Sequence, residues 1–360
     1  MNRIENLRKL MAGEGVDALV VSSEVNQSYI SGLDYTDGYV LVLTDSAYVL
    51  ADFRYIEIAE MTVDSSIFHV IRPEGAMLTC VCEILAKAGV RKVAFEENEL
   101  NVASYLRLRG SLDKSVELAP GGSSLLNMLR QVKDEGEIAT IAKAQSITDR
   151  AFTHMLDFIK PDMTEREIAL ELEYCMRRMG ADGMAFDVIA VSGSASSLPH
   201  GVPRDCKLER GFLTMDFGAK VDGYCSDMTR TIVIGKADAD IKKLYNTVLK
   251  AQLAALDYLR EGADCGEADK VARDIIDAVP EFNGAFGHSL GHSIGLYVHE
   301  TPGLSKRGFG TKLAAGQVTS VEPGIYLFGK YGCRIEDMVA IEKDGVHNFT
   351  HSTKELIEIY

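Results

Sequence analysis

The sequence lacks three features, and each absence excludes a class of protein. It has no run of about 18 apolar residues, and its charged start, MNRIENLRKLMAGEG, has no apolar stretch of signal-peptide length, so we expect no membrane span and no export. It has no excess of basic residues: 38 Lys and Arg stand against 53 Asp and Glu, a formal net charge of −15, which argues against nucleic acid and anionic membranes as partners. Its seven cysteines form no CxxC pair, and we interpret them as reduced thiols of a cytoplasmic protein.

The patterning along the 360 residues predicts two domains. Residues 16 to 120 alternate short apolar runs, such as VDALVVSS and GYVLVLT, with helical patterns such as CVCEILAKAG, which indicates an α/β domain. The small-residue cluster PGGSS then precedes a long helical pattern, so we place the boundary near Ser124, with domains at 1–124 and 125–360. Further helices are predicted at about 164–179, 239–260 and 266–279, and strands at about 212–217, 224–234, 317–322 and 333–342. The second domain is therefore predicted to be α+β, with antiparallel hairpins covered by helices.

The first of these hairpins carries two aspartates. In LTMDFGAKVDGYCSDMTRTIVIG, the dipeptide Asp222-Gly223 suits a tight turn, which places Asp216 and Asp227 on facing strands. Two registers are possible. A turn centred on this dipeptide places residue 227 opposite residue 218, and a turn shifted by one residue places residue 227 opposite residue 216. Both registers point the two carboxylates to the same face. Such a pair is stable only with a shared proton or a bound cation, unless the face is simply solvated.

The second hairpin weakens the alternative of ordinary solvated carboxylates. VTSVEPGIYLFGKYGCRIEDMVAI places Glu322 at a strand end and Glu336 on the return strand around Gly329, with matching parity and among apolar neighbours. Buried carboxylates without partners are costly, so these two require Arg334, a metal or both.

Three of the eight histidines lie in GHSLGHSIGLYVHE, residues 287–300. A helix would place His288 and His292 on one face, as in HExxH zinc peptidases, but Ser289 stands where the catalytic Glu would be, and the glycines disfavour a helix. We predict an irregular or extended segment in which glycine allows close backbone approach to a bound group. One histidine would be a ligand and the others proton carriers, with a hydrogen-bonded structural role as the alternative for any single one.

Four carboxylates and an imidazole form an oxygen-rich donor set. They are too many for one tetrahedral zinc ion and are suited to two divalent ions. Two such ions can hold a bridging hydroxide and polarise a carbonyl. The residues therefore predict metal-assisted hydrolysis.

These motifs resemble the pita-bread metallopeptidases, the family of methionine aminopeptidase, aminopeptidase P and prolidase, and most closely its Xaa-Pro peptidases. The resemblance implies five metal ligands: Asp216 in TMDFGA, Asp227 in GYCSDMTRT, His292 in LGHSIG, Glu322 in VEPGIY and Glu336 in RIEDMV. The first domain resembles the creatinase/prolidase N-terminal domain in DALVVSSEVNQSYISGL and LADFRY, so the similarity covers nearly the whole chain. Ser293 stands where many members have Gly, a departure that removes no ligand.

The resemblance also implies roles around the metals. The catalytic residues would be Glu322 as proton shuttle, His299 in VHE in contact with the scissile peptide, and His200 in FDVIAVSGSASSLPHGVP, an upstream histidine that lines the site. The substrate-binding residues would be His288 just beyond the metals and, at the proline pocket and its polar edge, Phe186, Val298, Tyr326 and Arg334.

The implied function is hydrolysis of the peptide bond between an N-terminal residue and a following proline, by an Xaa-Pro aminopeptidase or dipeptidase that uses a hydroxide bridging two divalent ions. Mn²⁺ is the expected metal, with Co²⁺, Zn²⁺ or Fe²⁺ as alternatives. We expect a cytoplasmic homodimer that binds Xaa-Pro peptides. The main alternative is a catalytically silent pita-bread binding or scaffold protein. Creatinase works without the metal set, and a dinuclear phosphoesterase would need more basic residues than Arg230 and Arg334, so both agree less well with these motifs.

Overall fold

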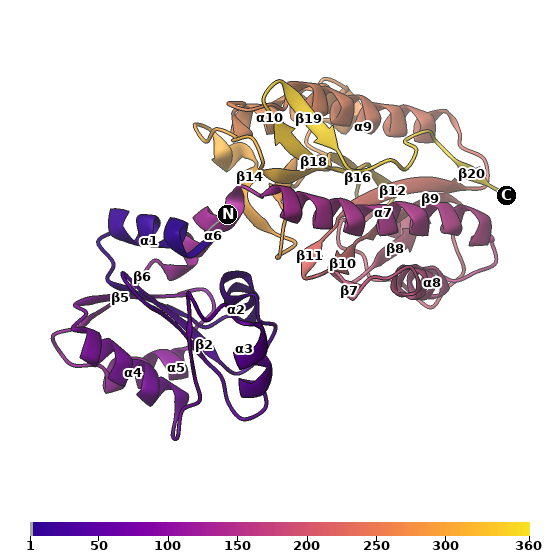
Figure 1. Cartoon of the computed structure of the whole chain (residues 1–360). Coiled ribbons are helices and arrows are strands. Elements are labelled where there is room, and N and C mark those ends of the chain that lie inside the picture. The colour runs from indigo at the N-terminus through magenta and orange to yellow at the C-terminus, as the bar shows by residue number, and fades with distance from the viewer. Residues whose placement is uncertain (1–2) are drawn as a thin grey trace. The chain divides into compact units, whose positions relative to one another are not determined.

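The structure is a computed structural model that describes residues 3–360, and the chain forms two compact units (Figure 1). The first ends at Arg130 and the second runs from Gln131 to Tyr360. Over residues 3–360, no helix is both long enough and apolar enough to cross a bilayer.

The first unit is an α/β domain around a six-stranded sheet in the order β4-β3-β2-β1-β5-β6. Its strands are β1 (Ala18–Val21), β2 (Tyr39–Leu43), β3 (Ala47–Leu50), β4 (His69–Ile71), β5 (Lys92–Phe95) and β6 (Glu117–Pro120). Its helices are α1 (Arg3–Gly13), α2 (Glu24–Ser31), α3 (Ile56–Thr62), α4 (Met77–Ala88), α5 (Val102–Ser111) and α6 (Gly122–Gln131). Strand β2 is antiparallel to both neighbours, whereas the other pairs are parallel. The predicted α/β class is confirmed.

Helix α6 contains the predicted domain boundary near Ser124, whereas the compact units divide after Arg130. The helix packs on the first unit because Gly122 lies directly against β5: a Cβ there would be 2.5 Å from the backbone of Phe95. Leu125 and Leu126 are also buried. The sequence PGGSS was interpreted as a turn, but its last three residues form the first turn of α6.

The second unit combines four long helices with short strands. The helices are α7 (Glu135–Phe158), α8 (Glu165–Arg178), α9 (Ala239–Tyr258) and α10 (Cys265–Asp277), with short 3₁₀ turns η1 (Gly193–Ser197), η2 (Pro280–Phe282) and η3 (Lys306–Gly308). The strands are β7 (Gly183–Met184), β8 (Ile189–Ser192), β9 (Gly211–Phe217), β10 (Ala219–Val221), β11 (Tyr224–Cys225), β12 (Met228–Ile234), β13 (Gly291–Ser293), β14 (Glu300–Leu304), β15 (Val318–Val321), β16 (Gly324–Leu327), β17 (Tyr331–Arg334), β18 (Asp337–Glu342), β19 (Gly345–Asn348) and β20 (Glu358–Ile359). Apart from the parallel pair β12–β20, the strand pairs are antiparallel.

Two helix pairs cover the strands of this unit (Figure 1). Helices α7 and α8 share a core with β9 and β12, in which Leu172 and Met215 are buried. Helices α9 and α10 share a second core with β15 and β18, in which Leu244 and Val339 are buried. The predicted α+β arrangement of antiparallel hairpins covered by helices is confirmed.

The first hairpin has the register of a turn centred on Asp222-Gly223. Both turn residues have positive φ, 47° and 82°, as a tight hairpin requires. Asp216 pairs with Thr229 across β9 and β12, so residue 227 falls opposite 218, the first of the two predicted registers. The predicted strand 224–234 is divided into β11 and β12, and Asp227 lies at the division.

The second hairpin is divided in the same way. Val321 pairs with Asp337 across β15 and β18, and Gly324 pairs with Arg334 across β16 and β17. Both ladders keep one register, which brings Glu322 opposite Glu336 at the gap between them. The predicted strand 317–322 therefore ends at Val321, directly before Glu322, and the predicted strand 333–342 is divided at Glu336.

Candidate metal centre and active site

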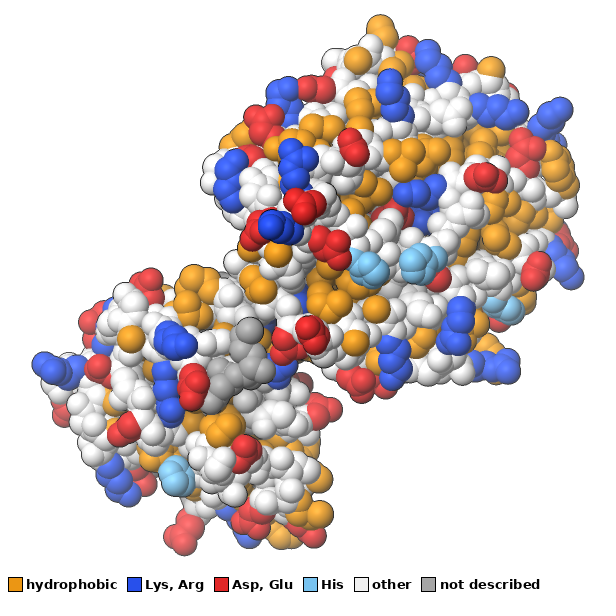
Figure 2. All heavy atoms as spheres, turned by 45° about the horizontal axis from the view of Figure 1, so that its top comes forward, with side chains coloured by type: hydrophobic (Ala, Val, Ile, Leu, Met, Phe, Trp, Pro, Cys, Tyr) orange, Lys and Arg blue, Asp and Glu red, His pale blue; other side chains and the backbone are white. Residues whose placement is uncertain are grey.

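The second unit contains a cavity of about 520 Å³ that gathers the predicted site residues. Those that line it are Asp216, Asp227, His292, Glu322, Glu336, His200, His288, His299, Arg334, Phe186 and Val298. Tyr326 is not a lining residue, although it contacts two that are. Histidine side chains are visible on the face of this unit that Figure 2 presents.

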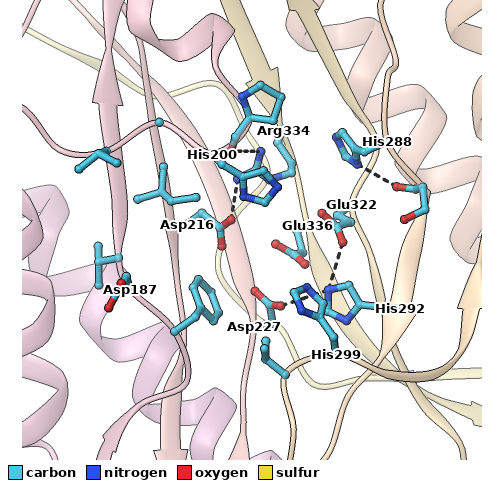
Figure 3. Close-up of a pocket in the computed structure, with 18 of the residues that line it drawn as sticks. Asp187, His200, Asp216, Asp227, His288, His292, His299, Glu322, Arg334 and Glu336 are labelled. Atoms are coloured by element: carbon cyan, nitrogen blue, oxygen red, sulfur yellow. Dashed lines mark hydrogen bonds and ion pairs between the residues drawn. The ribbon is translucent and has the colours of Figure 1, made fainter. Parts of the chain in front are cut away.

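The interruptions of the hairpins place four carboxylates and an imidazole around one point. Asp216 lies near the end of β9, and Asp227 directly precedes β12. His292 lies in β13, Glu322 directly follows β15, and Glu336 directly precedes β18. Figure 3 shows these side chains pointing toward one another from strands on both sides of the cavity.

Three of these residues already have the spacing of a metal site. One ligand atom from each of Asp227, His292 and Glu336 lies within 4.8 Å of the others. His292 Nε2 is 3.6 Å from Asp227 Oδ2 and 3.3 Å from Glu322 Oε1. His292 Nδ1 lies 3.2 Å from the carbonyl oxygen of Ser293, and this hydrogen bond leaves Nε2 to face the carboxylates.

The histidine segment is extended, as predicted, but its glycine contacts differ from the expectation. A Cβ at Gly291 would lie 2.1 Å from the carbonyl oxygen of Ser320, so this glycine allows close approach of a neighbouring strand rather than of a bound group. The Ser293 hydroxyl donates to the carbonyl of Pro302 at 2.7 Å and so points away from the ligand side.

Electrostatic repulsion within the cluster is strong when no cation is present. Burial, and then the charge of neighbouring carboxylates, raises the pKa of both Asp227 and Glu336 well above the usual range. Burial also raises the pKa of Asp216, although Arg334 opposes the shift. Burial opposes ionisation of Glu322 as well, but its hydrogen bond to His292 and the charge of that ring outweigh burial and lower its pKa to about 2.

The donor set fits divalent metal ions. Asp216 Oδ1 is buried and has no hydrogen-bond partner among residues 3–360, while Arg334 Nη2 donates to Oδ2 at 2.6 Å. A buried carboxylate oxygen without a donor is unfavourable unless a cation contacts it. Carboxylate-rich sites with one imidazole suit divalent ions such as Mn²⁺. Such sites also bind Co²⁺, Fe²⁺ or Zn²⁺.

A hydrogen-bonded chain connects two residues of the cavity wall, His288 and Arg334, through Tyr326. His288 Nε2 lies 3.0 Å from the Tyr326 hydroxyl, and Arg334 Nη1 donates to the same hydroxyl at 2.7 Å. Arg334 also contacts Asp216, so its guanidinium links this wall to the carboxylate cluster. Burial lowers the pKa of His288 and raises that of Tyr326 to about 12, so both groups are neutral near pH 7.

The remaining predicted residues lie on other sides of the cavity. The ring of His299 is edge-on to that of His292, with centroids 4.3 Å apart (Figure 3). Desolvation and then the nearby His292 lower the pKa of His299. Phe186 and Val298 supply apolar surface, and His200 follows the η1 turn.

The sequence reasoning missed Thr229, which orients two predicted residues. Its hydroxyl donates to Glu336 Oε2 at 2.7 Å and accepts from Arg334 Nε at 2.9 Å. A signal was available, because Thr229 follows Asp227 by two positions and therefore shares its strand face.

Comparisons with known proteins agree with this fold and site. The chain matches the Creatinase/Prolidase N-terminal domain over residues 3–132 and Metallopeptidase family M24 over residues 139–343. The uncharacterized peptidase YqhT of Bacillus subtilis is 39% identical, with 99% of each chain covered. Among solved structures, the Xaa-Pro dipeptidase from Bacillus anthracis has 38% identity, 99% of each chain covered and a TM-score of 0.95. The X-Pro aminopeptidase from Thermotoga maritima MSB8 has 34% identity, 98% of this chain and 100% of that chain covered and a TM-score of 0.88.

The fold, the carboxylate-rich cluster and these matches define a metallopeptidase. The chain belongs to metallopeptidase family M24, and the predicted family is confirmed. Membership of this family implies divalent metal ions at the cluster.

Proposed function

We propose that this metallopeptidase hydrolyses the peptide bond between an N-terminal residue and a following proline. The observation that carries the proposal is the convergence of Asp216, Asp227, His292, Glu322 and Glu336 on one cavity with an apolar wall. The relatives named as an Xaa-Pro dipeptidase and an X-Pro aminopeptidase support the substrate class.

The five converging residues would hold two divalent ions, and Mn²⁺ is the first to test because oxygen donors dominate the set. Bound there, the ions supply a hydroxide nucleophile and polarise the scissile carbonyl.

Glu322 is the proton carrier in this proposal. Its carboxylate lies 3.3 Å from His292 Nε2, among the proposed metal ligands, where it can accept the proton of the attacking water. It then delivers that proton to the leaving proline nitrogen, which has no N–H of its own in the substrate amide. His299, neutral because its pKa is lowered, donates a ring N–H to the developing oxyanion.

Specificity for proline would come from the walls of the cavity. Phe186 and Val298 offer an apolar surface for the rigid ring. The chain of His288, Tyr326 and Arg334 offers polar groups at the edge of that surface. His200 lines the same cavity and is assigned to substrate contact on the side of the η1 turn.

Product analysis by mass spectrometry tests the proposal. Mn²⁺-loaded protein is given an equimolar mixture of Ala-Pro, Ala-Pro-Ala-Ala and Ala-Ala-Ala-Ala, with a chelated sample as control. Cleavage of Ala-Pro alone identifies a dipeptidase, and cleavage of Ala-Pro-Ala-Ala an aminopeptidase. Equal cleavage of Ala-Ala-Ala-Ala refutes the proline pocket, and no cleavage with Mn²⁺, Co²⁺, Zn²⁺ or Fe²⁺ refutes the activity in favour of a binding protein.

A further inference from the structure

A buried ion pair outside the cavity joins the residues before α7 to the segment that carries His299. Lys133 Nζ lies 3.0 Å from Glu300 Oε2, and the two side chains are only 2% and 4% exposed. We propose that Lys133 is a positioning residue: its ammonium fixes the Glu300 carboxylate and, through it, the backbone that presents His299 to the cavity. The inference rests on the proposed function, because it assigns His299 a part in the reaction.

The Glu300 carboxylate organises the loop between β13 and β14. Glu300 pairs with Ser293 across these strands, so residues 294–299 form a closed loop between them. Within the loop, the Tyr297 N–H donates to Glu300 Oε1 at 3.4 Å. A Cβ at Gly295 would lie 2.7 Å from Glu300 Oε2, so the carboxylate packs directly on the loop backbone. Displacement of this carboxylate would therefore move the loop and the His299 that ends it.

Lys133 is anchored independently of the ion pair. Its N–H donates to the carbonyl of Gly316 at 2.9 Å. The next residue, Asp134, is the N-cap of α7 and forms a capping box with Glu137. These contacts hold the backbone of Lys133 in place, so a substitution at this position removes the ammonium without removing the anchor.

Loss of the ammonium would remove the charged partner that lies 3.0 Å from the buried Glu300 carboxylate. Removing one partner of such a pair is strongly unfavourable, and the carboxylate would turn toward solvent. The His299 ring lies 4.3 Å from the His292 ring, centroid to centroid, and a displacement of about 1 Å at a reacting geometry can lower a rate about 100-fold.

The test compares three variants of the full-length, Mn²⁺-loaded protein. Lys133→Met removes the charge and keeps the apolar stem, Lys133→Arg keeps the charge, and Lys243→Met removes an exposed partner of Glu281 as the matched control. For Ala-Pro cleavage, we expect Lys133→Met to lower kcat roughly 30- to 100-fold, with KM within about threefold and full metal content by mass spectrometry. Lys133→Arg should recover most of kcat, and Lys243→Met should match the wild type. A wild-type kcat in Lys133→Met, or a loss that follows metal content alone, would overturn the inference.

A double-mutant cycle with His299→Ala tests whether Lys133 acts through His299. If it does, Lys133→Met should lower kcat by less than about threefold in the His299→Ala background. Full additivity of the two losses would show that Lys133 acts elsewhere, and the inference would fail.

A measurement that needs no turnover separates failure of this inference from failure of the proposed function. In ¹³C-histidine-labelled, metal-free protein, the ring resonance of His299, assigned with His299→Ala, should shift or broaden in Lys133→Met and stay unchanged in Lys243→Met. An unchanged resonance refutes the inference, whereas a wild type that cleaves no Xaa-Pro peptide refutes only the proposed function. If Lys133→Met does not fold, the variant Lys133→Met/Glu300→Met removes both charges, and its His299 resonance provides the same decision.

Discussion

Replacement of Arg230 by Met should destabilise the second unit strongly. This guanidinium is 1% exposed and donates to Asp337 Oδ1 at 2.8 Å. It also donates to three backbone carbonyl oxygens beyond its own strand: that of Glu336 and, in the C-terminal segment, those of Ser352 and Thr353. The Arg230 side chain thus connects the backbone of Glu336, a predicted metal ligand, to the C-terminal segment.

The expected magnitude follows from what the substitution leaves behind. Asp337 keeps Lys354 Nζ at 2.6 Å and the Asn348 amide, so its charge is not wholly uncompensated, but the carbonyls lose a charged donor inside the protein. Breaking a buried ion pair costs about 3–5 kcal/mol, and we take about 4 kcal/mol for this case. For a domain of this size, that loss lowers Tm by roughly 8–16 °C.

Differential scanning calorimetry of the metal-free chain measures the change in the transition of the second unit. Lys243→Met, which breaks the exposed pair with Glu281, is the control and should cost less than about 1 kcal/mol. If Arg230→Met lowers stability no more than this control does, the argument from the buried network is wrong.

Two further predictions concern the carboxylate cluster. Glu322→Gln should lower kcat by roughly 10²- to 10⁴-fold, because an amide cannot carry the proton, while KM for Ala-Pro changes less than about tenfold; a variant that keeps most of its activity would remove Glu322 from this role. The second prediction concerns pH: because the pKa values of Asp227 and Glu336 are raised by folding, their contribution to stability is present below about pH 4 and is lost as pH rises through the folded values. Bound Mn²⁺ offsets this loss, so the Mn²⁺-induced rise in Tm should be larger at pH 8 than at pH 5.5, and a thermal shift that is equal at both pH values would contradict the assignment.

The sequence predicted the four long helices of the second unit and both hairpins because their signals are local. The dipeptide Asp222-Gly223 predicted the first turn and left two registers open, of which the structure has the first, and Gly329 predicted the second turn with matching parity of Glu322 and Glu336. The divisions of the strands at Asp227 and Glu336 were not predicted, because apolar patterning continues through them. Each hairpin resumes in the same register beyond its gap, so the sequence of the hairpin itself carries no signal for the interruption.

Contacts between distant residues were the other part that the sequence could not supply. Arg334 was expected at the polar edge of the proline pocket, yet its contact with Asp216 requires two hairpins to meet. Tyr326 was expected at the proline pocket, and the sequence could not supply its hydrogen bonds to His288 and Arg334, two residues that line the cavity. Lys133 carried no signal at all, since its partner Glu300 is far along the chain.

The two helix-covered cores divide the ligands between them. Asp216 and Asp227 are carried by strands packed under α7 and α8, whereas Glu322 and Glu336 adjoin strands packed under α9 and α10. An ion that engages both sets is a removable cross-link between the two halves. Local opening of either half would then have to break metal–ligand bonds, so the metal would govern how cooperatively this unit resists proteases as well as whether it reacts.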